Sequence, residues 1–440
     1  MRENLSQFVW TKKLLAIGTA LFLMLGMVVS VGADTTVLDK TAQVALGEKL
    51  YNDANLSFNT NQSCATCHNP GPPPVVGSFI DDRLPVQDLI DSGWPAAVPP
   101  PVSQGSDPSL FGGRNTPSAA YAAFSPAFRF DEVVGLYVGG QFWDGREMSL
   151  AGQAAGPFRN SVEMAMADKS AVVSALQLDP GGLGYQVLFA AAYETEDGLS
   201  FILSDVGTNN QAALEAYDLM AKAIGEFEKT QLFNKFNSKY DYFLAGLETL
   251  TDDEYKGLKL FEGKAKCALC HISQPSIAPD GGPMPPLFTD YTYDNLGVPY
   301  NKFIDILNGP QPPDFGLGGV LLDPAQNGKF KVMSLRNIEI TAPYGHNGVF
   351  QTLEQIVHFY NTRDVLPACN INLGNMDPGF GVTCWPDAEV PANMNVAELG
   401  DLSLSAKHEQ RIVAFLKTLT DRDLTAFPSV FDEAAFPPMP

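Results

Sequence analysis

Two short stretches of the sequence share the pattern C-x-x-C-H, and they begin at positions 64 and 267. In this spacing two thiols can bond covalently to the vinyl groups of a haem while the adjacent imidazole binds the iron. The residues that would hold two haems are Cys64, Cys67, His68, Cys267, Cys270 and His271. If both motifs bind haem, the chain must fold around two buried porphyrins.

Zinc sites and redox disulfides also use C-x-x-C pairs, so these alternatives need weighing. A zinc ribbon brings its second cysteine pair within roughly 15 to 20 residues, whereas about 200 residues separate the pairs here. Similar segments, 47–51 (GEKLY) and 257–261 (GLKLF), precede the two motifs. This repetition favours a duplicated helix-plus-haem unit over either alternative.

The N-terminus has the pattern of a secretory signal peptide. Lys12 and Lys13 precede an apolar run over 14–31, and Val31–Ala33 offers small residues for cleavage. We therefore predict a signal peptide over 1–33, a mature chain that begins near Asp34, and a periplasmic location. The alternative is an uncleaved anchor, because about 18 apolar residues can just span a bilayer.

Two cysteines remain after the haem motifs are assigned, Cys369 and Cys384. An oxidising compartment allows such a leftover pair to form a disulfide. The alternative is a pair of free buried thiols, which is less common in exported proteins.

The charge balance excludes some classes of partner. The chain has 28 Lys and Arg against 50 Asp and Glu, a net charge of −22. Nucleic acid and anionic lipid are therefore poor partners, and no membrane contact is expected after signal cleavage. A docking electron donor would be basic or would meet a locally neutral patch.

Hydrophobic periodicity predicts a mostly α fold with long loops. Helical spacing is clear over 214–227, 353–360 and 408–419, and no sustained strand alternation is present. A turn at 237–240 separates the two motif-bearing halves, so we predict domains over 34–236 and 237–440, each built around one haem.

The positions of the histidines distinguish the two haems. The chain has five, and none lies between His68 and His271. The three others, His346, His358 and His408, all follow the second motif. The first iron therefore has no local imidazole for its far side, and an open iron can bind peroxide.

Several longer motifs resemble the bacterial di-haem cytochrome c peroxidase and MauG family. The resemblance covers nearly the whole mature chain and implies two cytochrome c-like haem domains with long loops. The matching segments are 113–117 (GRNTP), 142–146 (FWDGR), 153–157 (QAAGP), 161–164 (SVEM), 335–337 (LRN) and 341–348 (TAPYGHNG).

In that family the first haem reacts with hydrogen peroxide. The resemblance places Glu163 and Gln153 over its open face as the acid-base group and its helper, and Trp143 between the haems as an electron relay. These residues are ten positions apart, so only loop folding can bring them together.

Two departures place the chain nearer to MauG. The stretch 75–113 contains no histidine to close the first haem, so that haem should be open when fully oxidised. Fourteen residues beyond His346 the peroxidases carry a Met ligand, whereas MauG carries Tyr, and the residue here is Tyr360. His358 and Met333 remain alternative ligands, although His358 should point away beside Glu354.

The resemblance also implies a calcium ion between the haem domains, held by Asn115, Thr341 and Pro343 through oxygen atoms. His346 is expected near a haem propionate, and His408 at a helix start. The Trp that MauG uses for transfer to its protein partner is replaced by Ala265 here.

These observations together predict an exported di-haem oxidoreductase. Peroxide reduction with a small cytochrome or copper protein (cupredoxin) as donor competes with MauG-like oxidation of a protein substrate. The alternative from another class is a non-catalytic electron carrier, in which both irons would be six-coordinate.

Overall fold

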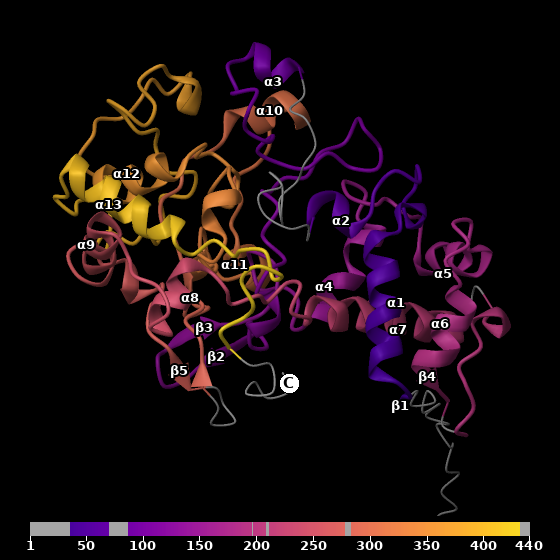
Figure 1. Cartoon of the computed structure of the whole chain (residues 1–440). Coiled ribbons are helices and arrows are strands. Elements are labelled where there is room, and N and C mark those ends of the chain that lie inside the picture. Colours follow the sequence, from indigo (N-terminus) through magenta and orange to yellow (C-terminus); the bar gives the residue numbers. More distant parts are fainter. Residues whose placement is uncertain (1–35, 70–86, 196, 208–210, 278–282, 432–440) are drawn as a thin grey trace, which may run out of the picture.

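The computed structural model describes most of the chain and shows a mostly helical molecule (Figure 1). The predicted signal peptide lies outside the described residues. No helix in the described part of the chain has the length and apolar character needed to cross a membrane. The described residues are 36–69, 87–195, 197–207, 211–277 and 283–431.

The first half of the chain, called the first unit, is built on α1 (Lys40–Asn52) and α7 (Gln211–Glu228), which cross each other (Figure 1). Asp39 begins α1 by accepting hydrogen bonds from the backbone N–H groups of Thr41 and Ala42. The other helices of this unit are α2 (Cys64–Cys67), α3 (Gln87–Asp91), α4 (Leu150–Ala155), α5 (Lys169–Leu178) and α6 (Tyr185–Ala192), with 3-10 turns at Ala54–Leu56, Ala122–Phe124, Pro157–Arg159 and Leu203–Asp205.

The second unit repeats this plan with α9 (Asp252–Glu262) crossing α13 (Ala406–Lys417). Ser405 begins α13 with a capping box, as Thr251 does for α9. The other helices are α8 (Lys239–Leu244), α10 (Lys302–Asn308), α11 (Leu317–Leu321) and α12 (Leu353–Thr362), with 3-10 turns at Cys267–Leu269, Pro324–Gln326, Ile338–Ile340 and Gly374–Met376.

A glycine lies where the two helices of each crossing come closest together. A Cβ on Gly47 would lie 2.0 Å from the carbonyl oxygen of Ala223, and one on Gly257 would lie 1.9 Å from that of Arg411. One turn further on, two rings meet edge to face in each unit. The pairs are Tyr51 with Phe227, at 5.4 Å, and Phe261 with Phe415, at 5.2 Å. The repeat seen in the sequence is therefore a repeat of structure.

Strands are short and pair only two at a time within the described residues. The hairpin of β2 (Arg129–Asp131) and β3 (Leu136–Val138) occupies the insertion between Phe124 and Gln141. Its Phe128 ring lies 5.9 Å from Tyr293 of the second unit, so the insertion packs between the units. The pairs are β1 (Thr36–Val37) with β4 (Tyr193–Glu194), β2 (Arg129–Asp131) with β3 (Leu136–Val138), β5 (Ser276–Ile277) with β6 (Pro283–Met284), and β7 (Tyr293–Asp294) with β8 (Phe330–Lys331).

A buried ionic network joins the two units. Arg336 donates two hydrogen bonds to Asp241, at 3.0 and 2.8 Å, and both side chains are almost fully buried. Its guanidinium lies over the rings of Tyr121 and Phe236 of the first unit. The Tyr121 hydroxyl in turn donates to Asp421 at 2.8 Å. The relative placement of the units is thus fixed by charge as well as by apolar contact.

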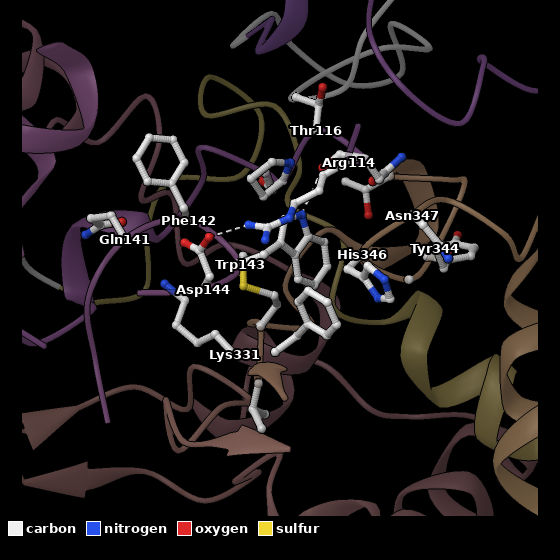
Figure 2. A pocket seen from close by; sticks show the side chains of 18 of the residues that line it. Arg114, Thr116, Gln141, Phe142, Trp143, Asp144, Lys331, Tyr344, His346 and Asn347 are labelled. Carbon is white, nitrogen blue, oxygen red and sulfur yellow. Dashed lines mark hydrogen bonds and ion pairs between the residues drawn. The ribbon is translucent and has the colours of Figure 1, made fainter. Parts of the chain in front are cut away.

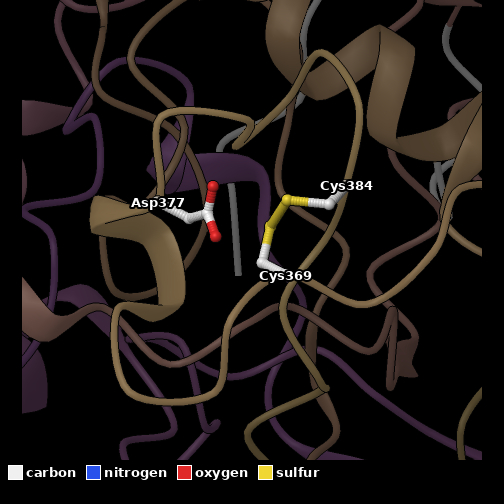
Figure 3. A group of neighbouring side chains, drawn as sticks. All are labelled: Cys369, Asp377 and Cys384. Atoms are coloured by element: carbon white, nitrogen blue, oxygen red, sulfur yellow. A yellow bond between two sulfur atoms is a disulfide. The ribbon is translucent and has the colours of Figure 1, made fainter.

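The structure confirms several sequence predictions. The three predicted helices correspond to α7, α12 and α13, although α13 begins two residues earlier than expected. Cys369 and Cys384 form the predicted disulfide (Figure 3). The segment at 237–240 is not an exposed linker, because Asn237 is fully buried and Ser238 begins α8.

We predict that Gly47→Ala destabilises the protein by about 1 to 3 kcal/mol, the usual range for overpacking a core. The added methyl group would meet backbone, which cannot rotate away. Thermal unfolding followed by circular dichroism measures the change, with Glu48→Ala at the neighbouring exposed position of α1 as the control. Equal melting temperatures of the two variants would show that the helix crossing tolerates a Cβ at Gly47.

Candidate functional site

One large cavity of about 810 Å³ lies between the two units. All six residues of the two C-x-x-C-H motifs line it, together with Trp143, Gln153, Glu163 and Tyr360. Ligand cavities usually measure about 300 to 1,000 Å³. The loop folding that sequence spacing could not show therefore brings every predicted haem and catalytic residue to one space.

The first haem motif forms α2 and follows directly on a capped turn. The Ser63 N–H donates to the Thr66 hydroxyl at 3.0 Å, and the Tyr51 hydroxyl donates to the backbone oxygen of His68 at 2.7 Å. Cys64 and Cys67 form no disulfide. Burial raises the pKa of the Cys64 thiol, so it is an uncharged sulfur facing the cavity.

The second motif presents a histidine in the protonation state that iron requires. The His271 Nδ1 lies 2.8 Å from the backbone oxygen of Phe288, and the ring also contacts the backbone of Met333. With Nδ1 donating its proton to Phe288, Nε2 is the nitrogen that would bind metal. Burial lowers the pKa of His271 to about 4, which keeps the ring neutral. Cys267 and Cys270 also form no disulfide, and burial raises the pKa of each thiol to about 12.

The cavity therefore fits haem c on its own geometry. It offers two pairs of thiols that form no disulfide, each pair followed by an imidazole. In addition, three buried polar atoms on its lining residues, the Tyr291 hydroxyl, Gln62 Oε1 and Glu228 Oε2, have no hydrogen-bond partner in the described part of the chain. Buried polar atoms normally have partners, so these three indicate a space made for a partly polar group.

Glu163 and Gln153 reach the cavity from two different elements. Gln153 lies on α4, and Glu163 follows the turn at Pro157–Arg159. The Asn160 amide donates to Glu163 Oε1 at 2.8 Å and fixes the carboxyl group. Burial raises the pKa of Glu163, while Arg146 and Asn160 act in the opposite direction. The result is a carboxyl group that holds a proton more readily than an exposed one.

Trp143 is held by contacts from both units (Figure 2). Its indole N–H donates to the backbone oxygen of Asn115 at 2.9 Å, and its own backbone oxygen accepts from Lys331 at 2.8 Å. The next residue, Asp144, pairs with Arg114 at 2.6 Å. The indole is thus fixed in the wall of the cavity that both haem motifs share.

Tyr360 lines the cavity from α12, and its hydroxyl makes no hydrogen bond within the described residues. Burial raises the pKa of this phenol. His358 does not line the cavity, because its Nδ1 lies 3.0 Å from Glu409 of α13. The predicted pairing of His358 with Glu354 is wrong, since the turn of α12 carries His358 toward α13. Met333, the other alternative ligand, also lines the cavity.

The two remaining histidines have structural contacts. His346 is buried, stacks on Phe330 with ring centroids 3.7 Å apart, and lies 3.3 Å from Glu389. It lines the cavity (Figure 2), and its place near a haem propionate stays a prediction. His408 is the third residue of α13 and completes the capping box with Ser405, which confirms its predicted place at a helix start.

The three predicted calcium ligands also come together. Asn115, Thr341 and Pro343 all line a small second cavity of about 10 Å³, beside the large one. That volume accommodates one atom of about the size of a water molecule. The Asn115 amide nitrogen donates to the backbone oxygen of Pro101 at 3.1 Å.

Sequence reasoning missed several residues of this site. Asn160, which fixes Glu163, lies just before the matching SVEM segment and gave no signal of its own. Lys331 is almost fully buried and donates from Nζ to the backbone oxygen of Gly140 at 2.6 Å. A lysine in an otherwise ordinary strand carries no sequence pattern that distinguishes it from an exposed one.

Comparison with known proteins identifies the family of the chain. The family model of the di-haem cytochrome c peroxidases matches residues 41–249. The methylamine utilization protein MauG of Paracoccus denitrificans (strain Pd 1222) is 38% identical over 388 residues, 87% of this chain and 89% of the relative. The chain belongs to the di-haem cytochrome c peroxidase and MauG family. It is therefore a haem oxidoreductase.

Other relatives support this assignment. The cytochrome c peroxidase Ccp of Escherichia coli (strain K12) is 31% identical over 320 residues, which cover 72% of this chain and 52% of the relative. Two solved structures share the fold. The di-haem peroxidase BthA of Burkholderia thailandensis E264 has a TM-score of 0.63 at 25% identity, covering 90% of this chain and 92% of that one. A MauG-like protein associated with microbial copper homeostasis has a TM-score of 0.60 at 27% identity, covering 89% and 93%.

Proposed function

We propose that this protein reacts with hydrogen peroxide at a haem held by Cys64, Cys67 and His68, and exchanges electrons with a protein partner through a second haem at the other motif. The observation that carries the proposal is the single cavity lined by both motifs and by Glu163, Gln153 and Trp143. Haem supplies the iron that binds peroxide and accepts or gives electrons.

Glu163 is the proton carrier of this proposal. Its Oε1 is occupied by Asn160 at 2.8 Å, so Oε2 is the atom that can take a proton from the near peroxide oxygen. The raised pKa of the buried carboxyl would help it return that proton to the peroxide oxygen farther from the iron, which leaves as water, while a bound haem would supply the two electrons that break the O–O bond. Gln153 contributes an amide that can hold the peroxide in line.

Tyr360 is our proposed iron ligand at the second haem. Its hydroxyl faces the cavity without a hydrogen-bond partner in the described chain, whereas His358 is engaged by Glu409. Burial alone opposes loss of the phenol proton, so a phenolate here needs a nearby cation, which iron would provide. A phenolate stabilises higher oxidation states of iron, which would let both haems share oxidising equivalents through Trp143.

The partner is proposed to be a protein that is basic or neutral at its contact surface, because the chain carries a net charge of −22. It is either an electron donor, such as a small cytochrome or cupredoxin, or a protein substrate oxidised in the manner of MauG. The partner used by MauG itself is not favoured, since Ala265 replaces the transfer Trp. The export signal over 1–33 would place the reaction in the periplasm.

A non-catalytic electron carrier is the second candidate. It would need both irons six-coordinate, yet no histidine follows His68 before His271, and a buried carboxyl group occupies the cavity instead. The peroxide reaction is therefore the better-supported function.

We further propose that Asn115, Thr341 and Pro343 bind one calcium ion in the small cavity. Side-chain and backbone oxygen atoms are the ligands that this hard cation prefers. Asn115 also accepts the Trp143 indole N–H, so an ion there would steady the relay residue.

The first prediction from the proposed function concerns peroxide cleavage. One equivalent of hydrogen peroxide added to the fully oxidised protein should bleach the Soret band and produce a near-infrared band. Glu163→Gln should slow this change about 10²- to 10⁴-fold, the usual contribution of a general acid-base group. Stopped-flow absorption measures the rates.

Glu132→Gln, at an exposed carboxyl of the same unit, serves as the control. Reduction by dithionite should proceed at an unchanged rate in both variants. If Glu163→Gln slowed the two reactions equally, Glu163 would have only a structural role. If the wild-type protein did not respond to peroxide in any redox state, the electron-carrier function would replace the proposed one.

The second prediction concerns the iron ligand. Tyr360→Phe removes the hydroxyl and should shift the absorption and electron paramagnetic resonance spectra of the second haem, with loss of the near-infrared band. His358→Gln removes the imidazole that contacts Glu409 and Trp385 and should leave both spectra as in the wild type. The opposite pattern would assign His358 as the ligand.

The third prediction concerns calcium. Asn115→Ala should lower the calcium content of the purified protein and slow electron exchange between the haems, whereas Asn115→Asp keeps an oxygen ligand and should retain the ion. Elemental analysis after dialysis against a chelator measures the content. Equal calcium in all three proteins would place the ion elsewhere or show that none is bound.

A further inference from the structure

Glu228 is a buried carboxyl group that the proposed reaction does not use. It is the last residue of α7, is 6% exposed, and lines the large cavity on the side of the first haem motif. Its Oε2 has no hydrogen-bond partner in the described part of the chain. The neighbouring Lys229 is directed to Glu226 instead, at 3.2 Å. A buried carboxylate without a cation or donor is costly, so this position requires an explanation.

The duplicated helix crossing shows that the fold does not need this carboxyl group. Ala223 and Phe227 meet Gly47 in the first unit in the same way that Arg411 and Phe415 meet Gly257 in the second. The residue after the phenylalanine is Glu228 in one unit and Leu416 in the other. Leu416 is 5% exposed and belongs to the apolar core of its unit.

The residue that lies beside this position also differs between the units, and it is again polar only in the first unit. Tyr51 of α1 lies near Glu228, and its counterpart Phe261 has no hydroxyl. The polar pair thus occurs only in the unit that would react with peroxide. Because a leucine is sufficient at this crossing, a glutamate indicates a role linked to the haem beside it.

We propose that Glu228 is a proton-carrying residue coupled to the charge of the first haem. One-electron reduction of that haem from ferric to ferrous by an external reductant takes up one proton from solvent, which converts the Glu228 carboxylate to the carboxylic acid. Oxidation releases the same proton. The net charge of the buried cavity then stays nearly constant as the iron changes its oxidation state.

The electrostatic surroundings support this coupling. Burial raises the pKa of Glu228 to about 8, and the negative end of α7 also disfavours the carboxylate. A positive charge on the iron lowers this pKa, and reduction raises it again. Glu228 interacts electrostatically with Tyr51 of α1 and with the Cys64 thiol of α2, and the Cys67 thiol interacts with the same two groups. The two thiols no longer titrate once they are bonded to haem. The Glu163 carboxylate also raises the pKa of the Cys64 thiol.

The proposal rests on haem binding at the first motif and not on peroxide chemistry. The test is a potentiometric titration of the haem-loaded protein between pH 6 and 9, with the two haems resolved by their spectra. In the wild type the potential of the first haem should fall as the pH rises, since reduction takes up a proton. Glu228→Gln should flatten this dependence, while the second haem remains unchanged.

Three further variants make the result specific. Leu416→Gln, the matched position in the second unit, should leave the first haem as in the wild type. Glu163→Gln should retain a pH-dependent potential. Glu228→Leu installs the residue that the second unit already uses, and it should match Glu228→Gln. If Glu228→Leu fails to fold, the glutamine variant alone decides.

A second readout identifies the proton itself. Infrared difference spectra between the oxidised and reduced protein should contain the carbonyl band of a carboxylic acid, and this band should disappear in Glu228→Gln. An unchanged band together with a fully retained pH dependence would overturn the proposal. Peroxide added to the same wild-type sample tests the proposed function separately, because a protein inert to peroxide can still show the coupling.

Discussion

The close approach of two helices through glycine is the constraint on which each haem unit depends. At Gly47 and at Gly257 the partner helix passes so near that a Cβ would overlap a backbone oxygen. This approach draws α1 onto α7 and α9 onto α13, and the segment after the first helix of each pair then carries the cysteines and histidine to the same cavity. The haem motifs therefore take their position from helix contacts that the haem does not make itself.

The two units share this frame but differ in the residues placed on it. His271 is held by the backbone oxygen of Phe288 at 2.8 Å, and Tyr360 stands on α12 in the same unit. In the first unit, carboxyl groups occupy the cavity instead, and burial raises the pKa of both Glu163 and Glu228. One frame thus presents an imidazole and a phenol in the second unit and buried carboxyl groups in the first, which is the division that the proposed peroxide cleavage and electron exchange would use.

Much of the fold was predictable, because its strongest signals are local. The C-x-x-C-H spacing identified the haem motifs, and the two cysteines left over identified the Cys369–Cys384 pair. Hydrophobic periodicity identified α7, α12 and α13. The convergence of Gln153 and Glu163 was not predictable, since the turn at Pro157–Arg159 breaks any helical register between them. The predicted partner of His358 was wrong for a different reason, because its observed partner, Glu409, lies on another helix. Glu409 is 51 residues away, and only tertiary contact brings it nearer than Glu354.

The distribution of charge also argues for what the cavity contains. The chain is strongly acidic, yet Arg114, Arg146, Lys331 and Arg336 all line the cavity on the side shared by the two units. Lys331 and Arg336 are almost fully buried, which is costly unless negative charge is close. Asp144, Asp241 and Asp314 supply part of it. The carboxylates of two haems would supply more negative charge, which explains why basic side chains line the cavity of a strongly acidic chain. Glu228 itself belongs to no ion pair among the described residues, because the neighbouring Lys229 pairs with Glu226. In our proposal its carboxyl group gains or loses a proton as the charge of the iron changes.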